Sequence, residues 1–272
     1  MSARRGLVWA VAIAWLLEHV VPFGRLVLYP FTLLATWVHE TGHGLAALAT
    51  GGHFDKLEIF ADASGLAHTR ESGNVAVAIT CLGGMLAPPL VGAIVLAVAR
   101  GPRRARITLA VIALALLATL ALWVRSPAGL VVVPLCAALL GWAAWSWEPG
   151  RRLVFAQFIA VMLALDTVGR MVGYAMSSKA TVGGEERTSD VAAVADALGG
   201  HHWLWGALVI TVALALLAAG LWIAWRPQRT SPPPRRAPAS RRRRAARPRS
   251  CRRCSGRGDR RARRRRCRCR RR

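Results

Sequence analysis

Several long stretches of this 272-residue chain contain no charged residue. Two of them run from Ile107 to Val124 and from Ala207 to Trp225, and each is about as long as a helix that spans a bilayer, roughly 17 to 25 residues. A core helix of a soluble protein would keep a polar stripe on its solvent face. The absence of charge therefore excludes a soluble globule and predicts a membrane protein with several spanning helices.

Acidic residues are also scarce, with 13 Asp and Glu against 38 Lys and Arg. The excess of positive charge is concentrated at the C-terminus, because residues 226–272 hold 23 Arg and a single acid, Asp259. Residues 1–225 therefore form a nearly neutral, apolar body, and an Arg-rich tail follows it. An ordinary nucleic-acid-binding fold carries its basic residues on a folded face, so the charge pattern excludes that class and any specific recognition of nucleic acid.

The tail from Arg226 to Arg272 lacks the apolar residues that a core requires, and it is predicted to be disordered. A basic segment after a membrane helix is expected to bind anionic lipid, or nucleic acid without sequence specificity; a tail without function is the alternative. A structural zinc site is not favoured, because one cysteine pair has an atypical Cys-x-Cys spacing and no core surrounds the four cysteines Cys251, Cys254, Cys267 and Cys269.

Cysteine is too sparse elsewhere for a disulfide framework, which is typical of small, Cys-dense secreted domains. Cys81 and Cys136 lie inside apolar runs, where a thiol behaves as a small hydrophobe. The N-terminus places Arg4 and Arg5 before an apolar run, as in a signal peptide. No clear small-x-small cleavage site precedes the next membrane segment, so we interpret this stretch as a retained signal anchor.

The predicted fold class is all-α, a polytopic membrane helix bundle of about seven segments. Residues 1–225 form the membrane-embedded domain, and residues 226–272 form the tail. The polar stretch Gly52–Gly73, with turn residues at Asp62–Gly65, predicts a short β-hairpin, and Ser177–Gly200 is predicted to be a polar loop. The seven segments are Leu7–Val21, Leu26–Thr50, Asn74–Ala99, Ile107–Val124, Ala128–Trp147, Leu153–Met176 and Trp203–Trp225.

The distribution of Arg predicts the orientation in the membrane, because cytoplasmic loops are enriched in basic residues. The loop Arg100–Arg106, the turn at Arg151–Arg152 and the C-terminal tail are basic, so we place them in the cytoplasm. The polar loop Ser177–Gly200 and the predicted hairpin then lie outside. Gly83–Gly84 and Pro88–Pro89 interrupt the third segment, and a re-entrant hairpin there would reverse the orientation of everything before it.

His39-Glu40-Thr41-Gly42-His43 is an H-E-x-x-H motif on a predicted helix. Residues i and i+4 share a helix face, so both imidazoles can bind one Zn²⁺ ion. Glu40 is placed as a catalytic base that takes a proton from the water that zinc activates at neutral pH. Two His and a Glu at membrane depth are costly unless they are paired or bound to metal. The motif therefore predicts a metallopeptidase with Zn²⁺ as its cofactor.

A catalytic zinc site needs a third protein ligand and one open position. Asp166 is the first candidate, because it lies in an otherwise apolar segment where an acid is functional by default; the alternative is a structural ion pair with Arg170, one turn later. Asp190 is the rival candidate in the polar loop, and the alternative there is a helix cap after Ser189. The residues alone leave this choice open.

These motifs resemble the site-2 protease class of intramembrane zinc metallopeptidases. The resemblance is carried by His39–His43 on an early membrane helix, by Gly51–Gly52 with the β-like stretch after it, and by the Gly/Pro-rich run Cys81–Pro89. The chain is most similar to a compact bacterial branch without PDZ or CBS domains. That branch has a late Ser-Asp-Ala-type motif, which Ser189–Val191 approximates.

The resemblance implies a zinc-dependent endopeptidase that cleaves membrane-associated or membrane-spanning substrates within or near the lipid bilayer. The third ligand of the class is an Asp in an Asn-Pro-Asp-Gly-like motif, and that motif is missing because the only Asn in the chain is Asn74. The run Asp166–Gly169 keeps only an acid before a Gly. The alternative function is a non-catalytic membrane scaffold or transporter that retains the metal motif as a relic.

Overall fold

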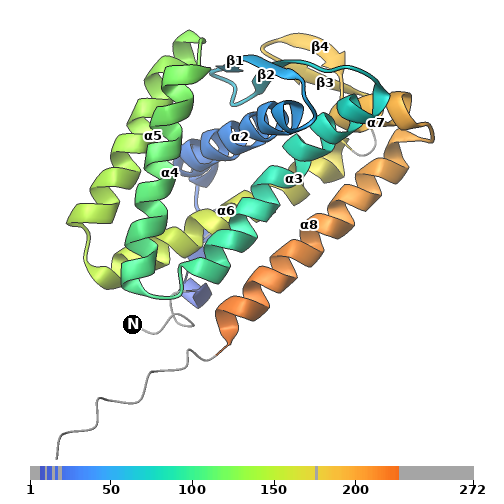
Figure 1. Cartoon of the computed structure of the whole chain (residues 1–272). Coiled ribbons are helices and arrows are strands. Elements are labelled where there is room, and N and C mark those ends of the chain that lie inside the picture. The colour runs from blue at the N-terminus through green and yellow to red at the C-terminus, as the bar shows by residue number, and fades with distance from the viewer. Residues whose placement is uncertain (1–6, 10, 14–15, 18–19, 175–176, 227–272) are drawn as a thin grey trace, which may run out of the picture. The chain divides into compact units, whose positions relative to one another are not determined.

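The computed structural model describes residues 7–226 except 10, 14–15, 18–19 and 175–176, and it describes only the backbone of residues 25 and 166–174. Long helices dominate, and two small antiparallel hairpins interrupt them (Figure 1). The predicted helical membrane bundle with a short hairpin is therefore confirmed. In chain order the elements are α2 (Gly24–Ala49), β1 (His53–Ile59), β2 (Gly65–Arg70), α3 (Asn74–Val98), α4 (Pro102–Leu122), α5 (Pro127–Ser146), α6 (Pro149–Tyr174), β3 (Lys179–Val182), β4 (Glu185–Thr188), α7 (Asp190–Leu198) and α8 (His202–Trp225).

Four helices in the described part of the chain are long and apolar enough to cross a membrane, namely α3, α4, α5 and α8. Each matches one predicted segment. Helices α2 and α6 have 26 residues each and match two more segments, although polar side chains lower their hydropathy. The first predicted segment, Leu7–Val21, lies only partly within the described residues, and the tail predicted to be disordered lies outside them after Arg226.

Glycines allow α2 and α3 to approach closely. A Cβ atom on Gly42 would lie 2.5 Å from the Cβ of Ala87 and 2.7 Å from the carbonyl oxygen of Gly83. A Cβ on Gly83 would lie 2.4 Å from the Cβ of Ala46. Small residues are the usual means by which membrane helices bring their backbones together. The contact places the half of α2 that carries the H-E-x-x-H motif directly against α3.

Helix α3 is continuous from Asn74 to Val98, with Pro88 and Pro89 inside it. The re-entrant hairpin considered for this segment is therefore not formed, and the segment crosses the bundle once. Proline is tolerated inside membrane helices because neighbouring helices and local backbone adjustments satisfy the freed carbonyl groups.

The predicted hairpin forms between β1 and β2, with Leu57 opposite Ala67. The connection between α4 and α5 joins the outer edge of β1, because the Leu57 N–H donates to the Trp123 carbonyl at 2.8 Å and the Arg125 N–H donates to the Leu57 carbonyl at 3.0 Å. The first hairpin is thus fixed to the bundle through β1. The opposite edge of this hairpin, formed by β2, is free to contact α2.

The stretch predicted as a polar loop, residues 177–200, instead forms a second hairpin, β3–β4, and the short helix α7. The sequence pattern gave no sign of it because this ribbon is largely exposed and therefore lacks an apolar face. The Ser189 hydroxyl caps α7 and accepts a hydrogen bond from the Ala192 N–H at 3.3 Å. At the tip of the second hairpin, the Gly183 N–H donates to Ser64 Oγ in the turn of the first hairpin at 2.9 Å.

The basic loops and the two hairpins lie at opposite ends of the bundle (Figure 1). The Arg100–Arg106 connection, the α5–α6 turn and the C-terminal end of α8 share one end, which we call the arginine end; both hairpins and α7 lie at the other, the hairpin end. At the arginine end, the guanidinium carbon of Arg106 lies 4.7 Å from the ring centroid of Trp145. Arg and Trp together are typical of the headgroup region of a membrane.

Ser126 ties the end of β1 to the start of α5, and its loss is a direct test of how the first hairpin is held. The buried hydroxyl accepts from the Ile59 N–H at 2.8 Å, donates to the Ile59 carbonyl at 2.9 Å and accepts from the Gly129 N–H at 3.2 Å. We expect Ser126→Ala to lower the free energy of unfolding by about 2–4 kcal/mol, because buried backbone groups lose their partners. Denaturation in detergent measures it.

The matched control is Ser146→Ala, which removes the same hydroxyl from an exposed position at the end of α5. We expect it to leave stability within about 0.5 kcal/mol of the wild type. Equal stability of the two variants would contradict the anchoring role of Ser126.

Candidate metal centre

His39 and His43 lie one turn apart on the same face of α2, as their spacing requires. Their Nε2 atoms are 3.0 Å apart, and their ring centroids are 4.7 Å apart. His43 is buried and His39 is half-buried. The two imidazoles therefore direct equivalent nitrogen atoms toward one point beside the helix.

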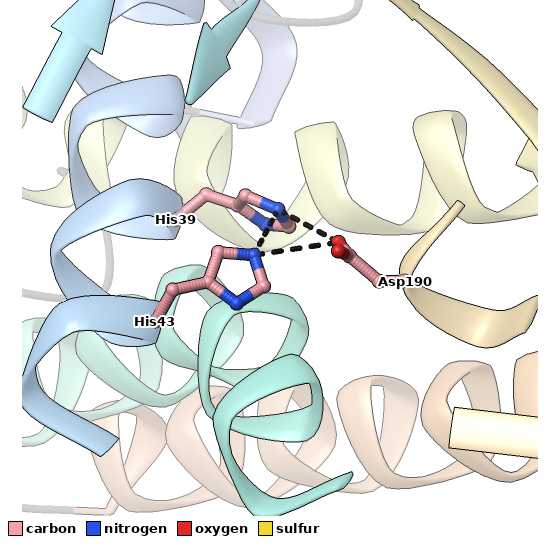
Figure 2. A group of neighbouring side chains, drawn as sticks. All are labelled: His39, His43 and Asp190. Atoms are coloured by element: carbon pink, nitrogen blue, oxygen red, sulfur yellow. Dashed lines mark hydrogen bonds and ion pairs between the residues drawn. The ribbon is translucent and has the colours of Figure 1, made fainter. Parts of the chain in front are cut away.

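Asp190, the first residue of α7, completes this group, as Figure 2 shows. Its Oδ2 atom lies 3.1 Å from His39 Nε2 and 3.4 Å from His43 Nε2. Burial would raise the pKa of the Asp190 carboxyl, but the neighbouring imidazoles of His43 and His39 hold that pKa well below its usual value. One carboxylate oxygen thus faces a ring nitrogen of each imidazole.

Of the two candidate acids, Asp190 has its side chain beside the His pair. Among the described residues, His39, His43 and Asp190 form the group whose potential ligand atoms all lie within 4.8 Å of one another. Asp166 lies in residues 166–174 of α6, of which only the backbone is described, so its prediction as the third ligand stays a prediction.

Helix α3 orients His43 through a backbone contact. His43 Nδ1 lies 2.9 Å from the carbonyl oxygen of Thr80, so a proton on Nδ1 is donated to that oxygen and the Nε2 lone pair stays free. Such a bond to the second ring nitrogen is the usual way in which a protein orients a ligating His. Gly84, one turn further along α3, makes room for the ring, because a Cβ there would lie 2.2 Å from His43 Nε2.

Glu40 is held by the first hairpin. It is 6% exposed, and its Oε2 atom accepts a hydrogen bond from the Ala67 N–H of β2 at 2.7 Å. Gly65 allows this approach, since a Cβ there would lie 2.6 Å from Glu40 Cγ. One turn earlier on α2, Thr36 Oγ1 donates to the Ala63 carbonyl at 2.7 Å. No described residue donates a hydrogen bond to the second carboxylate oxygen of Glu40, Oε1.

A cavity of about 250 Å³ contains these groups. Its walls come from α2, β2, α3, β3 and the Arg187–Val191 stretch that leads into α7. His39, Glu40, His43 and Asp190 all line it. Two imidazoles and the carboxylates of Glu40 and Asp190 thus share one cavity between membrane helices and hairpins.

The donor set fits a Zn²⁺ ion. Two ligand atoms that each lie about 2.0 to 2.1 Å from a tetrahedral zinc are about 3.3 Å apart. The three separations between His39 Nε2, His43 Nε2 and Asp190 Oδ2 are 3.0, 3.1 and 3.4 Å. Two imidazole nitrogens with one carboxylate oxygen are also a ligand set of catalytic zinc sites, which keep their fourth position for water or substrate.

A family model described as peptidase M50B-like matches residues 6–220, which include the His pair, Glu40 and Asp190. The chain belongs to the M50B-like peptidase family. This membership confirms the resemblance to site-2 proteases, a class of membrane-embedded metalloproteases. No curated protein and no solved structure matches the chain significantly.

Sequence reasoning missed three features of the site: the Thr80 carbonyl that orients His43, the Ala67 amide that binds Glu40, and the room that Gly84 leaves for the His43 ring. Backbone groups carry no side-chain signal, so the first two had no visible pattern. The glycine pair Gly83–Gly84 was visible as an interruption of an apolar run. Its meaning depends on α3 lying against α2, which no local pattern shows.

Gly84→Ala tests whether the space beside His43 matters. The new methyl group would meet the imidazole, so we expect the ring to move and zinc affinity to fall by about 10- to 100-fold, while the helix is retained because Ala favours helix over Gly. Zinc competition with a chromophoric chelator measures the affinity. The control is Gly141→Ala in α5, where a Cβ would meet nothing within 4 Å; equal affinities in the two variants would refute the requirement for space.

Proposed function

We propose that this chain is a zinc-dependent intramembrane endopeptidase that cleaves membrane-associated or membrane-spanning substrates. The observation that carries the proposal is the convergence of His39, His43 and Asp190 beside buried Glu40, in a cavity bounded by membrane helices. Ionisable groups in such surroundings are expensive and are retained for function. The M50B-like family match supports the same chemistry.

His39 Nε2, His43 Nε2 and Asp190 Oδ2 would hold the ion. When bound, Zn²⁺ supplies Lewis acidity, which lowers the pKa of a water molecule to about 7 and polarises a peptide carbonyl. The Thr80 carbonyl keeps the proton of His43 on Nδ1, so that Nε2 remains available. The negative charge of Asp190 offsets part of the charge of the ion, which matters where the dielectric constant is low.

Glu40 would transfer the protons of the reaction. Its Oε2 atom accepts the Ala67 N–H, so Oε1 is the atom that takes a proton from the attacking water. The same atom then donates that proton to the nitrogen of the leaving amine. Because the hydrogen bond from β2 fixes the carboxylate, the base keeps one orientation through both transfers.

The arrangement of the bundle also supports an orientation for the protein. By the positive-inside rule, the arginine end faces the cytoplasm. The Arg-rich tail that starts at Arg226 would then lie on the cytoplasmic side, where anionic lipids attract basic segments. The cavity is bounded by both hairpins, so substrates would be cut near the opposite, outer surface of the membrane.

Glu40→Gln separates catalysis from metal binding. The variant keeps the shape of the side chain but cannot take a proton, so we expect zinc content to stay at the wild-type level while hydrolysis falls at least about 100-fold. The measurement is cleavage of a fluorogenic single-span peptide in nanodiscs, with zinc determined on the same sample. Glu148→Gln is the control, because Glu148 is exposed at the arginine end.

A Glu40→Gln variant with near wild-type cleavage would show that another group activates the water. A wild-type protein that binds zinc but cleaves no membrane peptide would favour the non-catalytic scaffold.

Paired substitutions of the two acids identify the third ligand. We expect Asp190→Asn to lower zinc affinity at least about 10-fold, because a neutral amide is a poor zinc ligand, and Asp166→Asn to keep the wild-type affinity. Asp196→Asn, an exposed position on the same helix as Asp190, is the control. Zinc titration measures all three. Loss of zinc from the Asp166 variant alone would make Asp166 the ligand instead.

A further inference from the structure

Glu71 lies in the short connection between β2 and α3, and it lines the same cavity as the His pair. Its carboxylate oxygen Oε1 is buried and has no hydrogen-bond partner among the described residues. No described Lys, Arg or His lies within ion-pair distance of this carboxylate either. A buried carboxylate oxygen without a partner is costly, so a donor for it is expected to enter from the cavity.

The other charged groups of the cavity already have partners. Glu40 accepts the Ala67 N–H, and Asp190 lies against the His pair. Arg187 lines the cavity as a cation, but its guanidinium pairs with Glu185 at 3.0 Å. Glu71 is therefore the carboxylate that the rest of the described site leaves uncompensated.

The charge balance of a zinc-loaded site points to the same residue. Neutral imidazoles leave the two positive charges of the ion to be offset by Asp190 and Glu40. Arg187 and Glu185 offset each other. Glu71 then gives the cavity a net negative charge, and an uncompensated charge attracts a cation strongly where the dielectric constant is low.

We propose that Glu71 is a specificity-determining residue that binds a Lys or Arg side chain of the substrate near the scissile bond. This inference rests on the proposed peptidase function. Glu71 lines the same cavity as His39, His43 and Asp190, so the acidic subsite adjoins the metal site. Lys and Arg have long apolar stems that allow the charged group to reach a polar site from apolar surroundings.

The favoured substrates are therefore membrane spans that carry a basic residue where they enter the cavity, at the hairpin end. A span whose corresponding residue is neutral would leave Glu71 Oε1 without a donor and would be cut more slowly.

The test uses the full-length zinc-loaded protein in nanodiscs and synthetic single-span peptides of Leu and Ala. Each pair of peptides differs at one residue, which is either Arg or citrulline, a neutral side chain of nearly the same shape, and that residue is moved one position at a time along the hairpin-end half. At the best position we expect the wild-type kcat/KM to be at least about 10-fold higher for Arg, as for a charge-assisted hydrogen bond. We expect Glu71→Gln to bring this ratio close to one.

Glu58→Gln is the matched control, because Glu58 lies on β1 and does not line the cavity. It should keep the wild-type ratio. A Glu71→Gln variant that cleaves both peptides more slowly with an unchanged ratio would show a structural role and overturn the proposal. A wild-type ratio near one at every position would overturn it as well.

Binding to the inactive Glu40→Gln protein gives a second readout that needs no turnover. We expect it to bind the Arg peptide at least about 10-fold more tightly than the citrulline peptide, and Glu71→Gln in the same background to abolish the difference. If the binding ratio is present but the wild type cleaves nothing, the peptidase proposal fails and the acidic subsite stands. If both peptides bind equally tightly while the wild type cleaves normally, the proposed role of Glu71 is wrong and the peptidase proposal stands.

Discussion

Ionisable side chains inside an apolar bundle need a partner for every buried polar atom, and the arrangement of this molecule follows from that requirement. His39, Glu40 and His43 lie on a helix surrounded by membrane spans. Their partners come from three separate segments: the Thr80 carbonyl on α3, the Ala67 amide on β2 and the Asp190 carboxylate on α7. The two hairpins and α7 are thus parts of the site as well as connections between helices.

The backbone contacts require close approach, and glycine provides it on both helices. Gly42 and Gly83 bring α2 and α3 together, and Gly84 lets the carbonyl of Thr80 reach the ring of His43. A larger residue at these positions would separate the helices and break the contact that orients the imidazole. Packing between the helices and the chemistry of the site therefore depend on the same few positions.

The elements of the fold that have a distinctive local sequence pattern could be predicted from the sequence. Charge-free runs predicted the membrane helices, and turn residues with alternating apolar positions predicted the first hairpin. Sequence spacing alone placed His39 and His43 on one helix face. The second hairpin was missed because its exposed strands have no apolar face to reveal them.

Long-range contacts could not be predicted in the same way. Asp166 was preferred to Asp190 because an acid in an apolar segment is unusual, whereas an acid after Ser189 also fits a helix cap. The structure shows that the two roles are compatible, since Ser189 caps α7 and so places Asp190 against the His pair. Glu71 gave no signal at all, because its unpartnered oxygen becomes apparent only when the cavity is formed.

X-ray absorption spectroscopy at the zinc K-edge of the purified full-length protein tests the central claim most directly. The account predicts one zinc ion per chain with nitrogen and oxygen neighbours at about 2.0 to 2.1 Å and the multiple-scattering pattern of two imidazoles. A protein that binds no zinc would contradict the account. So would a shell of sulfur at about 2.3 Å, which would place the metal on cysteines instead of His39, His43 and Asp190.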